Sequence, residues 1–336
     1  MRPLLRYSAV LILVVLSTMA RGQMTITGAG ATFPGPLYAK WFEAYRNIDP
    51  SVRFVYQAVG SGEGQRRITE QTVDFGASDA PMSHEALAQA PGKILHIPTV
   101  AGAVVITYNL HGVDDLKLDG AAIAGIFLGR ITQWDAPEIA AQNPGVKLPD
   151  EEIAAVHRTD SSGTNYIFTD YLSTVSADWK LKVGRYTSVR WLAGLGCNGS
   201  EGVTREIRQT PGSIGYVELS YALENKLPFA WIKNAEGAYI KASFDSIIAA
   251  LSSAAIPQDL RLSIVNAPGA SSYPIAGVTW LLAYQNSKEP AKGKKLAEFL
   301  RWAATDGEKM ARSMDYAPLP ENVRARVLGE IDSIQP

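Results

Sequence analysis

The chain has a single cysteine, Cys197, so it cannot form an intramolecular disulfide. It also lacks a strong charge of one sign, with 32 Lys and Arg against 33 Asp and Glu. That balance argues against nucleic acid as a partner, because nucleic-acid-binding domains are usually strongly basic. Apolar residues make up 46% of the chain, enough to stabilise a folded protein of this length through its core alone.

The sequence has little of what catalysis or metal binding needs. No pair of histidines has the spacing of a metal-binding helix, and no Gly-x-Ser-x-Gly or Gly-Lys-Ser/Thr motif occurs. Gly28-x-Gly30 lacks the third glycine of a dinucleotide fingerprint. We therefore expect no catalytic residue, no metal ion and no cofactor. The four histidines are His84, His96, His111 and His157.

The only long apolar run lies near the start of the chain. Arg2 and Arg6 precede the run at residues 10–16, and small residues follow at Ala20 and Gly22. The run is much shorter than the ~20 residues that a membrane span needs. The pattern predicts a cleavable signal peptide over residues 1–22 and a periplasmic protein.

Removing this segment leaves 336 − 22 = 314 residues. It also removes three arginines and no acid, which leaves 32 − 3 = 29 basic against 33 acidic side chains. At ~150 residues per domain, this length favours two lobes.

Short apolar strands alternate with amphipathic helical stretches, which indicates an α/β protein. No Pro/Gly-rich linker separates two halves, so we expect the chain to cross between lobes on extended segments. Residues 97–107 and 273–284 are apolar, rich in β-formers and interrupted by Gly102 or Gly277. Lobe I is therefore predicted over residues 23–98 plus 275–336, and lobe II over 99–274. Expected strands are 24–27, 52–58, 74–78, 95–99, 103–109, 153–157 and 213–217; expected helices are 36–46, 64–71, 121–127, 165–172, 203–209 and 292–303.

Four segments share a strand end, small or hydroxyl residues, and in most cases a helix start. Helix N-termini offer unpaired N–H groups and partial positive charge, so several that converge would bind an anion. Arg158 is the one cation among them, so hydroxyl groups and helix dipoles would supply most of the donors. Taken singly, each segment is better explained as a helix cap or a turn than as part of a binding site. The segments are Thr27-Gly-Ala-Gly-Ala-Thr-Phe-Pro34, Gly60-Ser-Gly-Glu-Gly64, Phe75-Gly-Ala-Ser-Asp79 and Arg158-Thr-Asp-Ser-Ser-Gly-Thr164.

Together these segments resemble the phosphate-binding protein of the high-affinity bacterial phosphate ABC importer. The resemblance continues through Pro211-Gly-Ser-Ile-Gly-Tyr-Val-Glu218 and Met314-Asp-Tyr-Ala-Pro-Leu-Pro320, so it covers nearly the whole chain after residue 26. It implies a two-lobed periplasmic-binding-protein-like α/β fold of type II, with the ligand in the cleft. It also implies that a monomer binds inorganic phosphate and delivers it to the membrane permease subunits of an ABC importer.

The resemblance implies a phosphate site built by residues from all four segments. A hydroxyl and backbone amides would come from Thr32 and Phe33, and a hydroxyl from Ser61, which would also cap its helix. The remaining contacts would come from Arg158, held by Asp160; from amides and hydroxyls of Ser162, Gly163 and Thr164; and from Asp79.

Asp79 would accept a hydrogen bond from a proton still carried by phosphate. Fully ionised sulfate has no such proton, so two acceptors would face each other, at a cost of at least roughly 1–3 kcal/mol. The competing interpretation is that Asp79 caps a helix near Ser83.

Three positions depart from the expected pattern. Glu63 places a carboxylate near a helix N-terminus that should face the anion, and would lower affinity if it faces the cleft. Ser161 stands where the family commonly has glycine, and Cys197 has no evident partner. His157, next to Arg158, would add charge at low pH unless it is packed.

Three other functions remain open from the sequence. The first is binding of another tetrahedral oxyanion, among which arsenate resembles phosphate in its protonation. The second is a sensor or scavenger that never meets a transporter. The third is a phosphate-ester hydrolase, whose nucleophile and base the sequence does not reveal.

Overall fold

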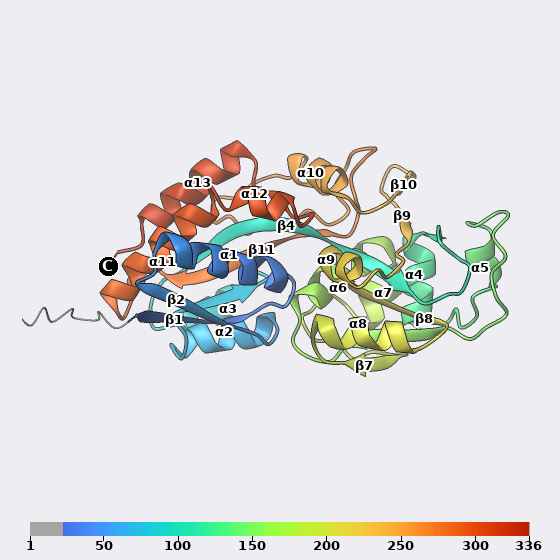
Figure 1. The fold of residues 1–336 in the computed structure, drawn as a ribbon. Helices are drawn as coiled ribbons and strands as arrows, with labels where there is room; N and C mark the ends of the chain where they lie inside the picture. Colours follow the sequence, from blue (N-terminus) through green and yellow to red (C-terminus); the bar gives the residue numbers. More distant parts are fainter. Residues whose placement is uncertain (1–22, 336) are drawn as a thin grey trace, which may run out of the picture.

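The computed structural model describes residues 23–335, so the predicted signal peptide at 1–22 lies outside the described residues. The elements form two halves (Figure 1). The first and last parts of the chain lie together in one half, and the middle of the chain forms the other. Within the described residues, no helix is long and apolar enough to span a membrane.

The first half is built on parallel strands that alternate with helices. Strand β1 (Met24–Gly30) lies between β2 (Val52–Ala58) and β3 (Phe75–Ser78), and both pair with it in parallel. In a parallel arrangement the carboxyl ends of the strands meet at one edge, where ligands commonly bind. Three helices follow these strands: α1 (Gly35–Ile48), α2 (Ser61–Thr69) and α3 (His84–Ala88).

One long strand belongs to both halves. Strand β4 (Ile94–Tyr108) pairs with β11 (Ala276–Tyr284) through Ala103, and from Val104 onward with β8 (Ser213–Glu218). All fifteen of its residues are buried, which explains its continuous apolar sequence. The sheet therefore runs through the junction in the order β2-β1-β3-β11-β4-β8-β6-β7, and β12 (Ala317–Pro318) also pairs with β4.

The expectation of two strands broken at Gly102 was wrong, because β4 is continuous there. A Cβ atom at Gly102 would lie 2.6 Å from the Phe33 ring. This glycine lets an aromatic side chain pack directly on the strand, and it does not end the strand.

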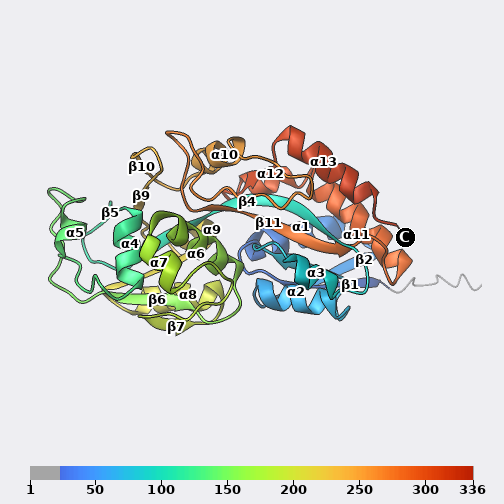
Figure 2. The same ribbon diagram turned by 180° about the vertical axis from the view of Figure 1, so that it is seen from behind.

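In the second half, β8 pairs in parallel with β6 (Ala154–Arg158), and β6 pairs in parallel with β7 (Leu195–Cys197). Helix α8 (Gly199–Gln209) covers the face seen in Figure 1, and the opposite face, with α6 (Gly163–Val175), is seen in Figure 2. A small separate sheet has the order β10-β9-β5. The other elements of this region are β5 (Lys117–Leu118), α4 (Gly120–Phe127), α5 (Pro137–Ala140), α7 (Ala177–Lys182), α9 (Leu219–Glu224), β9 (Trp231–Lys233), β10 (Tyr239–Ile240) and α10 (Phe244–Ser252).

The C-terminal segment returns to the first half. Its helices α11 (Pro290–Ala303), α12 (Glu308–Arg312) and α13 (Glu321–Asp332) pack on that half (Figure 1). The buried Phe299 on α11 packs against Phe42 and Phe54, with ring centroids 5.3 and 4.5 Å apart. The division into lobe I, over 23–98 plus 275–336, and lobe II, over 99–274, stays a prediction.

The remaining expected elements all occur, and the helices are longer at their starts than predicted. The expected helices at 64–71 and 203–209, for example, begin at Ser61 and Gly199. Both early turns are rich in Gly and Ser, residues of low helix propensity, and are therefore held by packing.

Gly64 decides how closely α2 approaches the sheet. A Cβ atom here would lie 2.6 Å from the Gly30 Cα and 2.7 Å from the Ala77 carbonyl oxygen. Backbone atoms of paired strands cannot rotate away, so Gly64→Ala should lower the free energy of unfolding by about 1–3 kcal/mol or more.

Urea unfolding would measure this effect against Gly329→Ala. Gly329 lies in α13, where an added Cβ meets nothing within 4 Å. The control should be neutral or more stable by up to about 1 kcal/mol, because alanine favours helix. Equal midpoints for the Gly64 variant and the parent would show that α2 does not depend on this contact.

Candidate functional site

The structure brings the four segments to one place. The Thr32 hydroxyl lies 2.8 Å from the Ser200 hydroxyl, which lies 3.2 Å from the Arg158 Nη1. The same nitrogen lies 3.5 Å from the Thr164 hydroxyl. These groups, with Ser61 and Asp79, are all buried and are called the anion cluster below.

A buried ion pair fixes the guanidinium. Arg158 donates from Nε to Asp160 Oδ1 at 2.7 Å and from Nη2 to Oδ2. Burial would raise the pKa of Asp160, but its bonds to Arg158 and the charge of that residue hold the pKa below its ordinary value. This two-point pair leaves Nη1 as the atom that points at the hydroxyls of the cluster.

Asp79 is a buried carboxyl with an unsatisfied oxygen. Asp79 directly follows β3 and is 2% exposed, and its Oδ1 has no hydrogen-bond partner among the described residues. Burial raises the pKa of Asp79 to about 7, while the Thr279 hydroxyl, the charge of Arg158 and the Ser61 hydroxyl oppose that rise. Thr279 Oγ1 likewise has no hydrogen-bond partner of good geometry within residues 23–335.

Asp79 is not the cap of the helix that follows. Ser83 caps α3, because its side chain accepts from the Ala86 amide at 3.1 Å. The capping interpretation of Asp79 is therefore wrong, and its carboxyl is free for another role.

Two helices begin at the anion cluster. Ser61 is the first residue of α2, with Gly60 at the N-cap, so the expected capping role of Ser61 is wrong. Its hydroxyl instead accepts from the Asp79 amide at 3.1 Å. Ser162 caps α6 by accepting from the Asn165 amide at 3.1 Å, which places Gly163 and Thr164 in the first turn.

A third helix start was missed by the sequence reasoning. Ser200 lies in the first turn of α8, whose N-cap Asn198 makes no side-chain capping bond. The Gly199 amide donates to Asp160 at 3.0 Å, so the start of α8 also holds the ion pair. The signal was present in Asn198-Gly-Ser-Glu201, a strand end followed by residues typical of a helix start.

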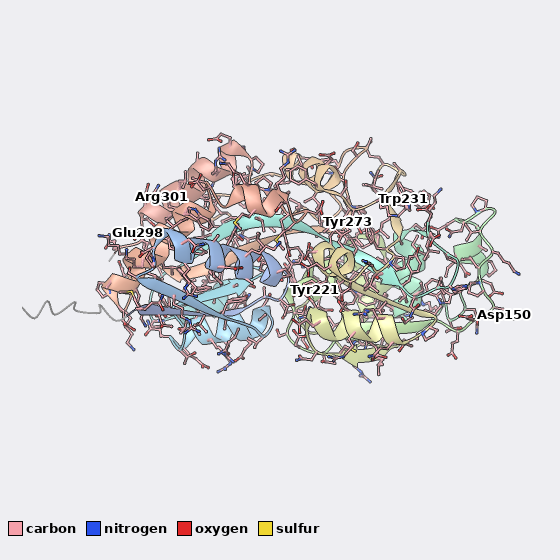
Figure 3. All side chains as sticks on the ribbon, viewed as in Figure 1. Asp150, Tyr221, Trp231, Tyr273, Glu298 and Arg301 are labelled. Atoms are coloured by element: carbon pink, nitrogen blue, oxygen red, sulfur yellow. The ribbon has the colours of Figure 1, made fainter. Side chains whose placement is uncertain are left out.

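Two tyrosines hold the loop that carries Thr32 and Phe33. Tyr221 of α9 donates to the Thr32 carbonyl at 2.8 Å, and Tyr316 donates to the Phe33 carbonyl at 2.7 Å. Tyr221 lies where the two halves face each other (Figure 3). Because Thr32 C=O and Phe33 N–H share one peptide plane, fixing this carbonyl also fixes the direction of that amide.

The two halves touch directly at the cluster. The Gly62 amide donates to the Ser161 carbonyl at 2.9 Å. A Cβ atom at Gly163 would lie 2.4 Å from the Ser61 hydroxyl and 2.5 Å from Asp79 Oδ2. The structure therefore has the two halves closed on each other, and only glycine fits at this contact.

The departures from the expected pattern have local explanations. Glu63 turns along α2 to Arg66 and Arg67, and these bonds lower its pKa to about 2. Arg66 is exposed and Arg67 half-buried, and within residues 23–335 Glu63 makes no side-chain hydrogen bond to a member of the anion cluster. Ser161 needs no left-handed backbone, and its hydroxyl donates to Thr187 at 2.8 Å.

His157 and Cys197 take no part in the anion cluster. The His157 ring stacks on Trp191 with centroids 4.6 Å apart, and burial lowers its pKa, which disfavours its charged form. Cys197 is a half-buried free thiol at the end of β7. Across residues 23–335, no group of three or more His, Cys, Asp or Glu side chains could hold a metal ion.

Comparison with known proteins agrees with this geometry. Residues 17–307 match the model of the PBP superfamily domain. The chain is 42% identical over 302 residues to the phosphate-binding protein PstS of Xylella fastidiosa, covering 89% of this chain and 82% of that one. It is 40% identical to PstS of Pasteurella multocida, covering 95% and 94%.

The chain belongs to the PstS family of phosphate-binding proteins. Solved structures of such proteins share its fold. One is a high-affinity periplasmic phosphate-binding protein (PfluDING) bound with phosphate, with a TM-score of 0.74 and 22% identity over 91% of this chain and 93% of that one. Another is the phosphate-binding protein of Stenotrophomonas maltophilia, with a TM-score of 0.71 and 22% identity over 91% and 93%. The expected two-lobed α/β fold is confirmed.

The close contact at Gly163 gives a test of closure in this family member. Gly163→Ala would push a methyl group into Ser61 and Asp79 and so hold the halves apart, while the helix start itself tolerates alanine. We expect anion binding to weaken at least tenfold, with little change in the melting temperature of the ligand-free protein. Titration calorimetry and thermal unfolding measure the two quantities.

Gly202→Ala is the matched control, because it lies in α8 and its Cβ would meet nothing closer than 3.6 Å. It should bind like the parent. Parent-like binding by the Gly163 variant would mean that binding does not need this contact.

Proposed function

We propose that this protein binds inorganic phosphate in the cleft between its two lobes, through the anion cluster, and delivers it to the membrane permease subunits of an ABC importer. The site comprises Thr32, Phe33, Ser61, Asp79, Arg158, Ser162, Gly163 and Thr164, with Asp160 in support. The relatives at about 40% identity, which are named as phosphate-binding proteins, support this function.

The unsatisfied Oδ1 of Asp79 is the observation that carries the choice of ligand. A buried acceptor beside the donors Ser61 and Arg158 suits a ligand that both accepts and donates hydrogen bonds. Phosphate near neutral pH accepts through its ionised oxygens and retains at least one proton to donate. A bond from that proton would pair Oδ1 and favour the ionised carboxylate.

The same feature sets the order among oxyanions. Sulfate at neutral pH has no proton to donate, so its oxygen would face Asp79 without a hydrogen between them. Arsenate keeps protons as phosphate does and should compete.

Export and delivery follow from the family and from the predicted signal peptide at 1–22. Closure of residues 23–98 plus 275–336 on residues 99–274 would present one shape to the permease when phosphate is bound.

A phosphate-ester hydrolase has less support. Ser61 is the hydroxyl nearest to Asp79 in the cluster, but it accepts from the Asp79 amide at 3.1 Å and lies 3.4 Å from the carboxylate. His157 packs on Trp191, so it is not positioned to activate Ser61.

Asp79→Asn tests whether Asp79 selects the ligand by accepting a hydrogen bond from its proton. The amide would offer N–H donors to any oxyanion, so the variant should narrow the ratio of phosphate to sulfate affinity by at least tenfold. Competition calorimetry at pH 7.5 on dialysed protein measures both constants. An unchanged ratio would contradict the role given to Asp79.

Arg158→Ala tests the single cation. Its loss removes a charge-assisted donor, worth roughly 1.5–3 kcal/mol, and leaves Asp160 as an uncompensated acid beside the ligand. We expect phosphate to bind at least tenfold more weakly. The control is Arg130→Ala, which breaks an exposed pair with Asp178 and should leave affinity unchanged.

A further inference from the structure

Glu218 is a second buried carboxyl, and the site described above makes no use of it. It ends β8, is fully buried, and pairs in register with Val104, where β4 passes from β11 to β8. Its Oε1 has no hydrogen-bond partner among the described residues and faces Gly102, the residue on which Phe33 packs. Glu218 therefore lies between the shared strand and the phosphate-binding loop.

No cationic side chain of residues 23–335 bonds to Glu218. From α9 it faces Ser220 and the phenol of Tyr221, and from the C-terminal segment it faces the phenol of Tyr316. The neighbouring β4 and loop residues, Gly102 and Phe33, are uncharged. Burial raises the pKa of Glu218 to about 8, and hydrogen bonds from Ser220 and Tyr316 only partly oppose this rise.

Counting protons shows what the carboxyl must supply. Tyr316 Oη lies 2.7 Å from the Phe33 carbonyl and 2.9 Å from Glu218 Oε2, but it has one proton to give. The carbonyl has none, so a bond to Phe33 uses the proton of Tyr316. Ionised Glu218 would then face Tyr316 as one acceptor against another, at hydrogen-bonding distance.

A proton on Glu218 removes this conflict. Glu218 Oε2 can then donate to Tyr316, and Tyr316 to the Phe33 carbonyl, while the Ser220 hydroxyl can donate to Tyr316 Oη at 3.0 Å. The Ser220 amide donates to Glu218 Oε2 at 2.8 Å. The neutral arrangement fills the contacts that lead to the loop and leaves no uncompensated charge in the core.

We propose that Glu218 is a positioning residue, protonated in the closed state, that acts through Tyr316 to hold the Thr32–Phe33 loop in its phosphate-binding conformation. This inference rests on the proposed phosphate site. When Glu218 loses its proton, Tyr316 donates its hydrogen bond to the carboxylate instead of to the Phe33 carbonyl. The Phe33 carbonyl is then left without a donor. The neutral form predominates below the raised pKa and is lost as pH rises through it, so affinity falls on the alkaline side.

The test compares pH profiles of phosphate affinity for the parent and Glu218→Gln between pH 6.5 and 9.5. The Gln side chain keeps an N–H donor at every pH. The Glu218→Gln variant should bind phosphate with an affinity within threefold of that of the parent at pH 6.5. Its loss of phosphate affinity between pH 6.5 and 9.5 should be at least threefold smaller than that of the parent. Titration of phosphate and of Asp79 affects both proteins alike and cancels in the comparison. Parallel profiles would overturn the proposal.

Two further measurements keep the test decisive if Glu218→Gln folds poorly. Tyr316→Phe removes the hydroxyl that links Glu218 to the Phe33 carbonyl, so this variant should bind phosphate more weakly at pH 6.5 and have a flatter pH profile of affinity. A profile as steep as that of the parent would also overturn the proposal. The infrared spectrum should contain a protonated-carboxyl band at pH 7 that diminishes by pH 9.5 and that Asp79→Asn retains, so that the band does not belong to Asp79. Absence of this band from the parent would also overturn the proposal. The control is Glu138→Gln, at an exposed position on α5, which should match the parent throughout.

The infrared result does not depend on phosphate. A parent protein that has the band but binds no phosphate would refute the proposed function and leave Glu218 protonated. A parent that binds phosphate but lacks the band would refute the role of Glu218 alone.

Discussion

The site must attract an anion although its own charges already cancel. Arg158 is bound at two points by Asp160, so the pair is close to neutral, and Asp79 adds a further acid. Burying such a pair gains little by itself, because desolvation offsets the attraction. What it provides is a guanidinium held in one orientation, with Nη1 directed at the hydroxyls. The attraction must then come from the starts of α2, α6 and α8, whose amides and dipoles carry positive potential without adding a titratable charge.

Attraction of an anion by helix starts requires the backbones of the two halves to approach each other closely. Helix dipoles act only within about a turn of the helix end, so three helix starts must approach one point from two lobes. The glycines of the site motifs make that approach possible: Gly64 lets α2 lie on the sheet, and Gly163 lets α6 reach Ser61 and Asp79. Recognition and closure thus depend on the same contacts, because the halves meet where the donors are.

Much of this arrangement could be predicted from local patterns. Strand ends followed by Gly, Ser and Thr indicated where helices begin, and the apolar stretches around Gly102 and Gly277 located the two long strands of the junction. Position-specific errors arose where packing decides. Ser61 has the composition of a cap, yet its hydroxyl serves Asp79 because Gly60 occupies the N-cap position. Gly102 resembles a strand break, yet the strand continues under the Phe33 ring.

Local sequence patterns could not predict residues that contact the site from distant positions in the sequence. Ser200, Tyr221 and Tyr316 contact the Thr32–Phe33 loop or Arg158 from positions 42 to 283 residues away in sequence. Tyr316 lies outside the helices, and Tyr221 lies in the first turn of α9, where nothing local distinguishes it from a core aromatic. Only the fold shows that their hydroxyl groups, rather than their rings, explain their places.

The loop between β1 and α1 lies between two buried acids with opposite tasks. In the proposed site the unpaired Oδ1 of Asp79 would accept the proton that arrives with the ligand, whereas Glu218 contacts Tyr316 behind the loop and is proposed to keep a proton of its own. Both pKa values are raised chiefly by burial, so both depend on the same closed packing of the two halves. If closure loosened, water would reach both carboxyls and each would ionise near its ordinary pKa. Proton occupancy and lobe closure are therefore linked, and in this protein the selectivity for a protonated anion and the stiffness of the loop that binds it have one physical origin.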